Sequence, residues 1–209
     1  MAPPPTIQEL FSLTGRVFLL VGGARTLGYD MALALAEAGA DGVVTSRSVD
    51  NAVAAAARIA AATGRRVTGL ALDAAEEEAV AAAVATAVGL YQRIDIVVNS
   101  VGGGGGGARA GPTGIEERLL STWESLQKIN VTAPFLVCKH VAPIMMKRRT
   151  GSIINIASIA GLVGRDRRVY PPAMASQPVD YAAAKGAIIA MTKDLAGYLT
   201  QRVGIAPGR

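Results

Sequence analysis

The chain has 209 residues, of which 51% are hydrophobic, so it is long enough to bury one sizeable core and is expected to form a single domain. Its net charge of +5 does not indicate a nucleic-acid partner, because only 4% of the residues are aromatic and the basic residues lie in short clusters such as Lys147 to Arg149. No uninterrupted apolar run approaches the roughly 20 residues of a membrane span, and the N-terminus lacks the apolar core of a secretory signal. The single Cys138 agrees with a reducing compartment. A cytoplasmic protein without a membrane partner is therefore predicted.

Apolar runs that are short enough to be buried strands alternate along the chain with longer, alanine-rich helical patterns. Residues 1–12 are expected to form a tail and residues 13–209 the folded domain. Strands are predicted at Val17 to Val21, Val43 to Thr45, Val67 to Leu72, Ile94 to Asn99 and Ser152 to Ile156, with a faint sixth at Val203 to Ile205. Helices are predicted at Leu27 to Ala38, Asn51 to Ala62, Glu76 to Val88, Glu116 to Arg148 and Tyr181 to Leu199. This alternation predicts an α/β fold with a doubly wound parallel sheet.

Two segments interrupt this regular pattern. Gly102 to Gly107 is a run of six glycines after the fourth strand, and it is either a flexible connection or an adaptable wall of a substrate cleft. Gly161 to Asp180 is rich in Pro, Arg and Gly, and it is expected to be a long loop.

The segment Gly22 to Gly28 joins the first predicted strand to the first predicted helix. Glycines at such a turn let the backbone approach a pyrophosphate, and the helix N-terminus offers it unpaired N–H groups and a positive dipole end. A tight connection without a ligand would have the same composition, but the position directly after the first strand favours a nucleotide site.

Tyr181 and Lys185 are four residues apart, so they share one face of a helix. A neighbouring ammonium group favours the phenolate form of a tyrosine, which suits proton transfer near neutral pH. The pair follows the segment Gly151 to Ser158, which contains the fifth predicted strand and ends in a serine.

Taken together, these motifs resemble the short-chain dehydrogenase/reductase family. The family pattern T-G-x-x-x-G-x-G is matched in part by Val21 to Gly28, in which Val21 lacks the usual hydroxyl and Thr26 stands where the pattern has glycine. N-N-A-G is matched in part by Asn99 to Gly102. We expect the Cβ of Thr26 to weaken cofactor binding. The resemblance implies a Rossmann-type dinucleotide-binding and catalytic domain over residues 13–209.

The resemblance also implies a role for each site residue. Ser158 would bind the substrate carbonyl, Tyr181 would donate its proton, Lys185 would hold the ribose hydroxyls and tune Tyr181, and Asn130 would help to hold a water in the proton relay. The implied cofactor-binding residues are Gly22, Arg25, Thr26, Leu27, Gly28, Ser46, Arg47, Asp73, Asn99, Tyr181 and Lys185.

Cofactor preference is indicated by the end of the second strand. Ser46 occupies the position at which family members use an acid to bind a free ribose 2′-hydroxyl, whereas Arg47 and Arg25 suit a 2′-phosphate. NADP(H) is therefore predicted over NAD(H), with a secondary alcohol and its ketone as the substrate pair. Oxoacyl thioesters and sugar acids are both plausible classes. No metal is predicted, because His140 has no cluster of ligands at metal spacing.

The resemblance ends at Ala206 to Arg209, before the family's last strand, so the chain is expected to be C-terminally truncated. A noncatalytic nucleotide-binding or oligomer-forming subunit is the alternative to an active reductase. By resemblance, the two long predicted helices Glu116 to Arg148 and Tyr181 to Leu199 are those that pair subunits in a homodimer or homotetramer.

Overall fold

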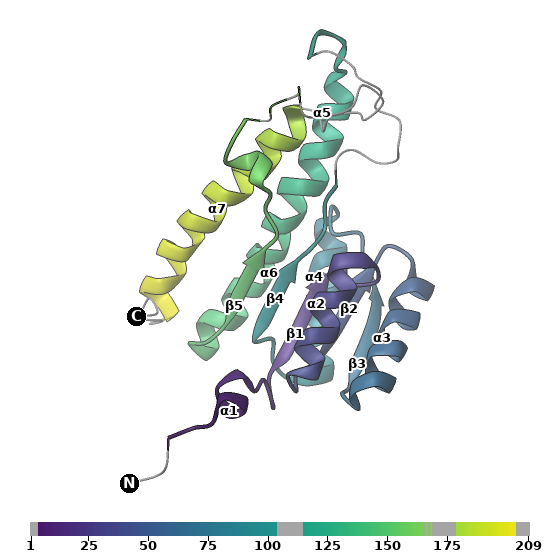
Figure 1. Ribbon diagram of the computed structural model, residues 1–209, viewed down its shortest axis with the longest axis vertical. Helices are drawn as coiled ribbons and strands as arrows, with labels where there is room; N and C mark the ends of the chain where they lie inside the picture. Colours follow the sequence, from purple (N-terminus) through teal and green to yellow (C-terminus); the bar gives the residue numbers. More distant parts are fainter. Residues whose placement is uncertain (1–3, 104–114, 165, 167, 169–178, 204–209) are drawn as a thin grey trace.

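The computed structural model describes residues 4–103, 115–164, 166, 168 and 179–203. Within them, five parallel strands form one sheet in the order β3-β2-β1-β4-β5 (Figure 1). The strands are β1 (Val17–Val21), β2 (Asp41–Ser46), β3 (Val67–Ala71), β4 (Ile96–Asn99) and β5 (Ser152–Asn155). The predicted doubly wound α/β fold is therefore confirmed. The strand order reverses between β1 and β4, which places a ligand crevice at their carboxyl ends.

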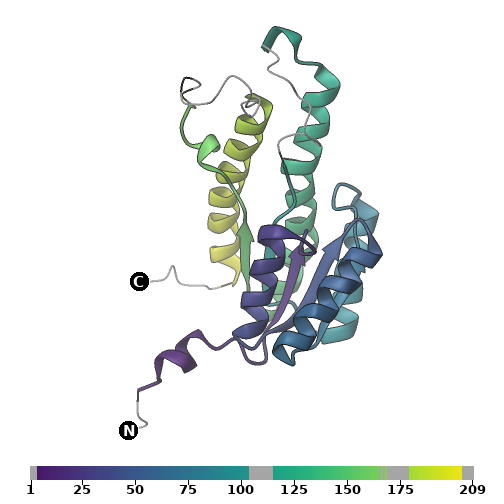
Figure 2. The ribbon, with the colours of Figure 1, turned by 45° about the vertical axis from the view of Figure 1, so that its right-hand side comes forward.

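Helices connect the strands and cover both faces of the sheet (Figures 1 and 2). They are α1 (Ile7–Phe11), α2 (Thr26–Glu37), α3 (Val49–Thr63), α4 (Glu77–Tyr91), α5 (Leu120–Gln127), α6 (Ala133–Arg148) and α7 (Val179–Val203). Short turns of other helical types are η1 (Ile115–Glu117), η2 (Lys128–Thr132) and η3 (Ile159–Gly161). α2 and α3 pack on one face, and α4 and α6 on the other, while α7 packs against α5, η2 and α6.

The core lies on both faces of the central strand. All five residues of β1 are buried, as expected for a strand covered by helices on each side. Small side chains let the helices approach the sheet closely, since Ala32 and Ala36 of α2 and Ala55 and Ala56 of α3 are buried against it.

The helical stretch Leu120–Arg148 is long and apolar enough to cross a membrane by length and composition alone. Half of its most apolar part is nevertheless buried inside the protein, where α6 packs against α4, α7 and β4. Packing of this kind is typical of a core helix.

Two predicted elements are corrected by the structure. The single helix predicted from Glu116 to Arg148 consists of η1, α5, the π-helical turn η2 and α6. Pro134 has no N–H to donate to the carbonyl of Asn130, and the N–H of Ala133 bonds instead to the carbonyl of Lys128, five residues back. The prediction of a sixth strand from Val203 to Ile205 is wrong at Val203, because this residue is the last of helix α7. The rest of that predicted strand lies outside the described residues.

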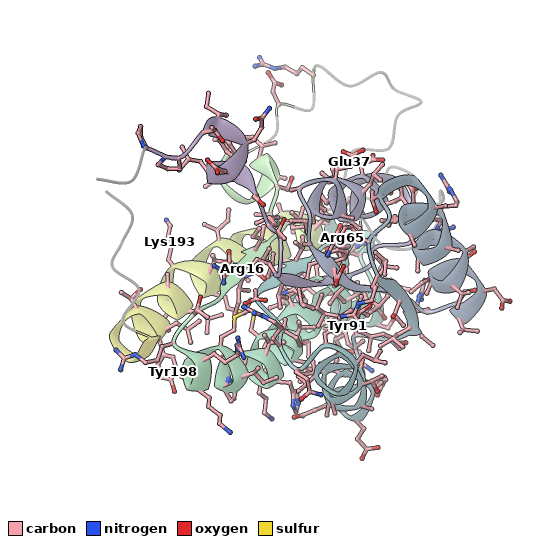
Figure 3. The ribbon with its side chains drawn as sticks, turned by 90° about the horizontal axis from the view of Figure 1, so that it is seen from below. Arg16, Glu37, Arg65, Tyr91, Lys193 and Tyr198 are labelled. Carbon is pink, nitrogen blue, oxygen red and sulfur yellow. The ribbon has the colours of Figure 1, made fainter. Side chains whose placement is uncertain are left out.

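The amino end of the sheet is held by an ion pair. Asp95 is buried at the start of β4 and accepts hydrogen bonds from Arg93, at 2.6 Å to each carboxylate oxygen, and from the amide of Val17 at 2.9 Å. Burial disfavours the Asp95 carboxylate, but these hydrogen bonds outweigh it, so the pKa of Asp95 is lowered. Figure 3 views this end and labels Arg16, a further partner of Asp95.

Candidate functional site

The first part of the candidate site is the turn between β1 and α2, at the carboxyl end of the central strand (Figure 1). Gly22 has a φ of +84°, which favours glycine, and a Cβ on Gly28 would overlap the carbonyl oxygen of Gly22. Arg25, which precedes α2, makes no side-chain hydrogen bond to the helix, and Arg25, Thr26 and Leu27 are exposed. The first turn of α2 therefore offers backbone N–H groups and a positive dipole end to an anion.

Thr45, at the end of β2, holds this turn in place. Its hydroxyl accepts a hydrogen bond from the amide of Gly22 at 3.3 Å, and its carbonyl accepts one from the amide of Gly23 at 3.0 Å. The side chain is buried, so the turn is anchored to a rigid strand. Sequence reasoning missed this residue, although a threonine that ends an otherwise apolar strand is a signal that was available.

Thr26 lies in a backbone conformation that suits glycine. Its φ is +46°, and a β-branched residue in this left-handed region is an outlier. Left-handed backbone costs an L-residue roughly 1–2 kcal/mol. This strain falls at the position where the family pattern has glycine. The threonine at this position therefore strains the backbone, in addition to placing a Cβ where a cofactor would approach the turn.

The end of β4 lies beside the turn. A Cβ on Gly22 would be 3.2 Å from the carbonyl of Ser100, and the amide of Ser100 donates to Val21 at 2.9 Å. Asn99 is buried and donates its amide to Oδ1 of Asn155 on β5 at 2.8 Å. Its own Oδ1 has no hydrogen-bond partner within the described residues. Asn99 therefore joins two strands directly beneath the crevice.

Asn130 is brought to the end of β4 by the π-helical turn η2. The side chain is fully buried, and its Nδ2 donates to the carbonyls of Gly103 and Leu126, each at 3.0 Å. Its Oδ1 accepts from the amide of Gly103 at 3.1 Å. This pair of bonds with Gly103 fixes the chain as it leaves β4.

Lys185 lies on α7 and reaches the same place. A Cβ on Gly102, whose φ is +138°, would be 2.5 Å from Oδ1 of Asn130 and 3.4 Å from Nζ of Lys185. The ammonium donates to the carbonyl of Ile156 at 2.7 Å. The side chain is 5% exposed, and burial lowers the pKa of Lys185.

Tyr181 is one turn before Lys185 on α7, and its ring centroid lies 5.8 Å from Nζ of Lys185. The structure thus brings Asn130, Tyr181 and Lys185 together around the end of β4. Nζ of Lys185 lies over the ring of Tyr181, so the two side chains make a cation–π contact.

Ser158 comes two residues after Ile156, whose carbonyl binds Lys185. It begins the turn η3, where its Oγ accepts from the amide of Ala160 at 3.2 Å. η3 packs closely on α7, because a Cβ on Gly161 would be 2.5 Å from the backbone of Lys185. The segment after β5 therefore reaches the helix that carries Tyr181, although most of residues 165–178 lies outside the described part.

The remaining predicted residues lie at the ends of β2 and β3. Arg47 is exposed after β2, and the hydroxyl of Ser46 accepts from the amide of Ser48 at 3.2 Å. Asp73 is exposed after β3, and its Oδ1 accepts from the amide of Ala75 at 3.0 Å. These residues border the crevice on the side of the sheet where β2 and β3 lie.

No group of His, Cys, Asp and Glu side chains in the described part of the chain is arranged to hold a metal ion. His140 contacts Glu77 at 3.2 Å on the outside of α6 and α4. Burial raises the pKa of the Cys138 thiol to about 11, which leaves little thiolate for chemistry near neutral pH.

Comparison with known proteins identifies many relatives. The profile of the short chain dehydrogenase family matches residues 16–208. A 3-oxoacyl-[acyl-carrier-protein] reductase of Synechocystis sp. is 31% identical over 201 residues, which are 94% of this chain and 75% of the relative.

Solved structures of oxidoreductases also align with this chain. A metagenomic short-chain oxidoreductase in complex with NADP aligns with a TM-score of 0.76 at 30% identity, over 91% of this chain and 79% of the other. An NAD+-bound xylitol dehydrogenase aligns with a TM-score of 0.77 at 30% identity, over 90% of this chain and 66% of the other.

The strain at Thr26 leads to a stability prediction. Thr26→Gly removes the left-handed strain at the cost of some chain entropy, so we expect the free energy of unfolding to rise by about 0.5–1 kcal/mol. Urea unfolding, followed by circular dichroism, measures the change.

Gln92→Gly is the matched control, because Gln92 also has a positive φ, of +61°, but lies at the end of α4, away from the turn. The free energy of unfolding should rise less in Gln92→Gly than in Thr26→Gly, because Gln is not β-branched. A Thr26→Gly protein that is less stable than the parent would show that Thr26 is not strained.

Proposed function

Because the chain belongs to the short chain dehydrogenase family, we propose that it is an NADP(H)-dependent oxidoreductase that interconverts a secondary alcohol and a ketone. One observation carries the proposal. Asn130, Tyr181 and Lys185 meet at the end of β4, directly beside the glycine turn after β1. This is the crevice in which an open α/β sheet binds a dinucleotide.

The turn itself fits a dinucleotide. A Cβ at Gly28 would fill the space that the turn needs, and the start of α2 has no capping side chain that competes for its N–H groups. When bound, the cofactor supplies or accepts the hydride at the substrate carbon. Gly22, Thr26, Leu27 and Gly28 would hold its pyrophosphate, Asn99 would shape the pocket, and Asp73 would contact the adenine.

The protein residues would manage the proton. In the direction of reduction, Ser158 binds the carbonyl oxygen and Tyr181 gives that oxygen its phenolic proton. Lys185, whose ammonium lies near the Tyr181 ring, stabilises the phenolate that remains. Asn130 would hold a water that returns a proton from solvent to this site.

Preference for NADP(H) over NAD(H) is supported by charge. Arg47 is exposed directly after β2 and Arg25 is exposed in the turn, while Ser46, the last residue of β2, carries no negative charge. An arginine pairs well with a phosphate, and an acid at this position would repel it.

The proposed substrate is a small ketone or secondary alcohol, with oxoacyl thioesters and sugar acids as its two candidate classes.

We further propose that the protein forms a cytoplasmic homodimer or homotetramer. Exposed apolar side chains on α5 and α6, namely Leu120, Trp123 and Phe135, support association through these helices.

A noncatalytic nucleotide-binding or oligomer-forming subunit is the second candidate, and one observation favours a loss of catalysis. The positive φ of Thr26 distorts the segment that would hold the pyrophosphate. The two candidates differ in whether Tyr181 has a chemical role.

The cofactor assignment predicts that Arg47→Ala weakens NADPH binding about tenfold and leaves NADH binding within twofold, because only NADPH carries the 2′-phosphate. Nicotinamide fluorescence titration measures both dissociation constants. Lys193→Ala, which removes a positive charge from an exposed position on α7, is the control and should change neither constant. Equal losses for both cofactors in Arg47→Ala would remove the argument for a 2′-phosphate site.

The catalytic assignment predicts that Tyr181→Phe lowers turnover by at least about a hundredfold while the cofactor dissociation constant changes little, because general acid catalysis contributes on the order of 10²–10⁴. A carbonyl-substrate screen that follows NADPH absorbance provides the assay. Tyr198→Phe, on the same helix, should keep full turnover. Unchanged turnover in Tyr181→Phe would exclude Tyr181 as the proton donor.

A further inference from the structure

A buried ion pair lies next to Tyr181, and the proposed chemistry gives it no role. Asp180, in the first turn of α7, is fully buried, and its Oδ2 accepts from Nε of Arg118 at 2.8 Å and from Nη2 at 2.6 Å. Its Oδ1 accepts from the amide of Tyr181 at 3.0 Å. The same carboxylate therefore binds the Arg118 guanidinium and the backbone of Tyr181.

The main chain of Asp180 has a second tie. Nε2 of Gln127 donates to the carbonyl of Asp180 at 3.2 Å. Gln127 ends α5 and is followed directly by η2, the turn that carries Asn130. Asp180 is thus bound both to Arg118, two residues before α5, and to Gln127 at its end, so α5 and the start of α7 are fixed together.

Because both side chains are largely buried, loss of either partner of the Arg118–Asp180 ion pair would destabilise the fold. The Arg118 side chain is 11% exposed and that of Asp180 is 0% exposed, so neither charge has water to replace a lost partner. A buried carboxylate left alone is strongly disfavoured, whereas a carboxylate in the first turn of a helix is favoured by the dipole. The geometry therefore gives the start of α7 one strongly preferred position.

We propose that Arg118 and Asp180 are positioning residues, which set Tyr181 in register with Asn130 and Lys185. The inference rests on the proposed function in so far as Tyr181 is the proton donor. Neither residue needs to touch the substrate, because Arg118 acts through Asp180 and Asp180 acts through the backbone of Tyr181. Small displacements of a reacting group are costly, since a shift of about 1 Å can lower a rate on the order of a hundredfold.

The test observes Tyr181 directly, without the need for turnover. The full chain is labelled with 3-fluorotyrosine, which gives one fluorine on each of its five tyrosines, and the Tyr181 resonance is assigned by its loss in Tyr181→Phe. Arg118→Gln is then compared with the parent by fluorine NMR. Arg118 is 62 residues from Asp180 in the sequence, so the substitution leaves the covalent neighbours of Tyr181 unchanged.

Arg93→Gln is the matched control. Arg93 also donates two hydrogen bonds to a buried carboxylate, that of Asp95, but Asp95 directly precedes β4 and so lies at the amino end of the sheet, away from the carboxyl ends of the strands. Both variants should lower the melting temperature. Only Arg118→Gln should shift or broaden the Tyr181 resonance, and a Tyr181 resonance that stays unchanged in folded Arg118→Gln would overturn the proposal.

If Arg118→Gln does not fold, the double variant Arg118→Gln/Asp180→Asn leaves no unpaired buried charge. The Tyr181 fluorine resonance of this double variant is then compared with that of the parent.

In an active preparation, Arg118→Gln should lower kcat on the order of tenfold or more with KM changed less than about threefold. Arg118→Lys should restore kcat only in part. A parent chain that binds no NADPH would end the proposed function, while a Tyr181 resonance that responds to Arg118 would still support the positioning role.

Discussion

The two hydrogen bonds between the Asn130 amide and the backbone of Gly103 connect the end of β4 to the helices that cover the sheet. Gly102 makes this approach possible, since any side chain there would collide with Asn130. On the other side, the bond from Lys185 to the carbonyl of Ile156 connects the end of β5 to α7. Together these contacts place Asn130 and Lys185, with Tyr181 beside Lys185, near the point where the strand order of the sheet reverses. The proposed chemistry depends on that placement.

Much of the fold was predictable because its signals are local. Val17–Val21 was predicted to the residue, since a run of five apolar residues between polar neighbours has few other interpretations. The spacing of Tyr181 and Lys185 predicts that they share one helix face, and their place after Gly151 to Ser158, together with the family resemblance, singles them out. The π-helical turn at Asn130 was not predicted, since the missing N–H of Pro134 changes the hydrogen-bond pattern without changing the apolar period. The pairing of Arg118 with Asp180 was also beyond sequence reasoning, because it joins residues that only the folded chain brings together.

The site combines a rigid half with a strained half. Asn130, Lys185 and Asp180 are buried and held by hydrogen bonds, so the half that would move a proton has little freedom. The turn after β1 is exposed from Arg25 to Leu27 and contains Thr26 in left-handed backbone. Strain of this kind persists only where the surrounding structure enforces it, and the turn is held by the close packing of Gly28 on Gly22 and by the hydrogen bond from the amide of Gly22 to Thr45. Whether a nucleotide binds depends on this exposed half, and the chemical role of Tyr181 then separates an active reductase from a noncatalytic subunit.

Binding of the cofactor precedes every step of the proposed reaction, so direct titration is the most informative measurement. The purified chain is titrated with NADPH and with NADH while nicotinamide fluorescence is followed, and circular dichroism confirms that the chain is folded. Saturable binding with a lower dissociation constant for NADPH is the expected result. Absence of binding by the folded chain would contradict the assignment of the crevice between β1 and β4 as a dinucleotide site.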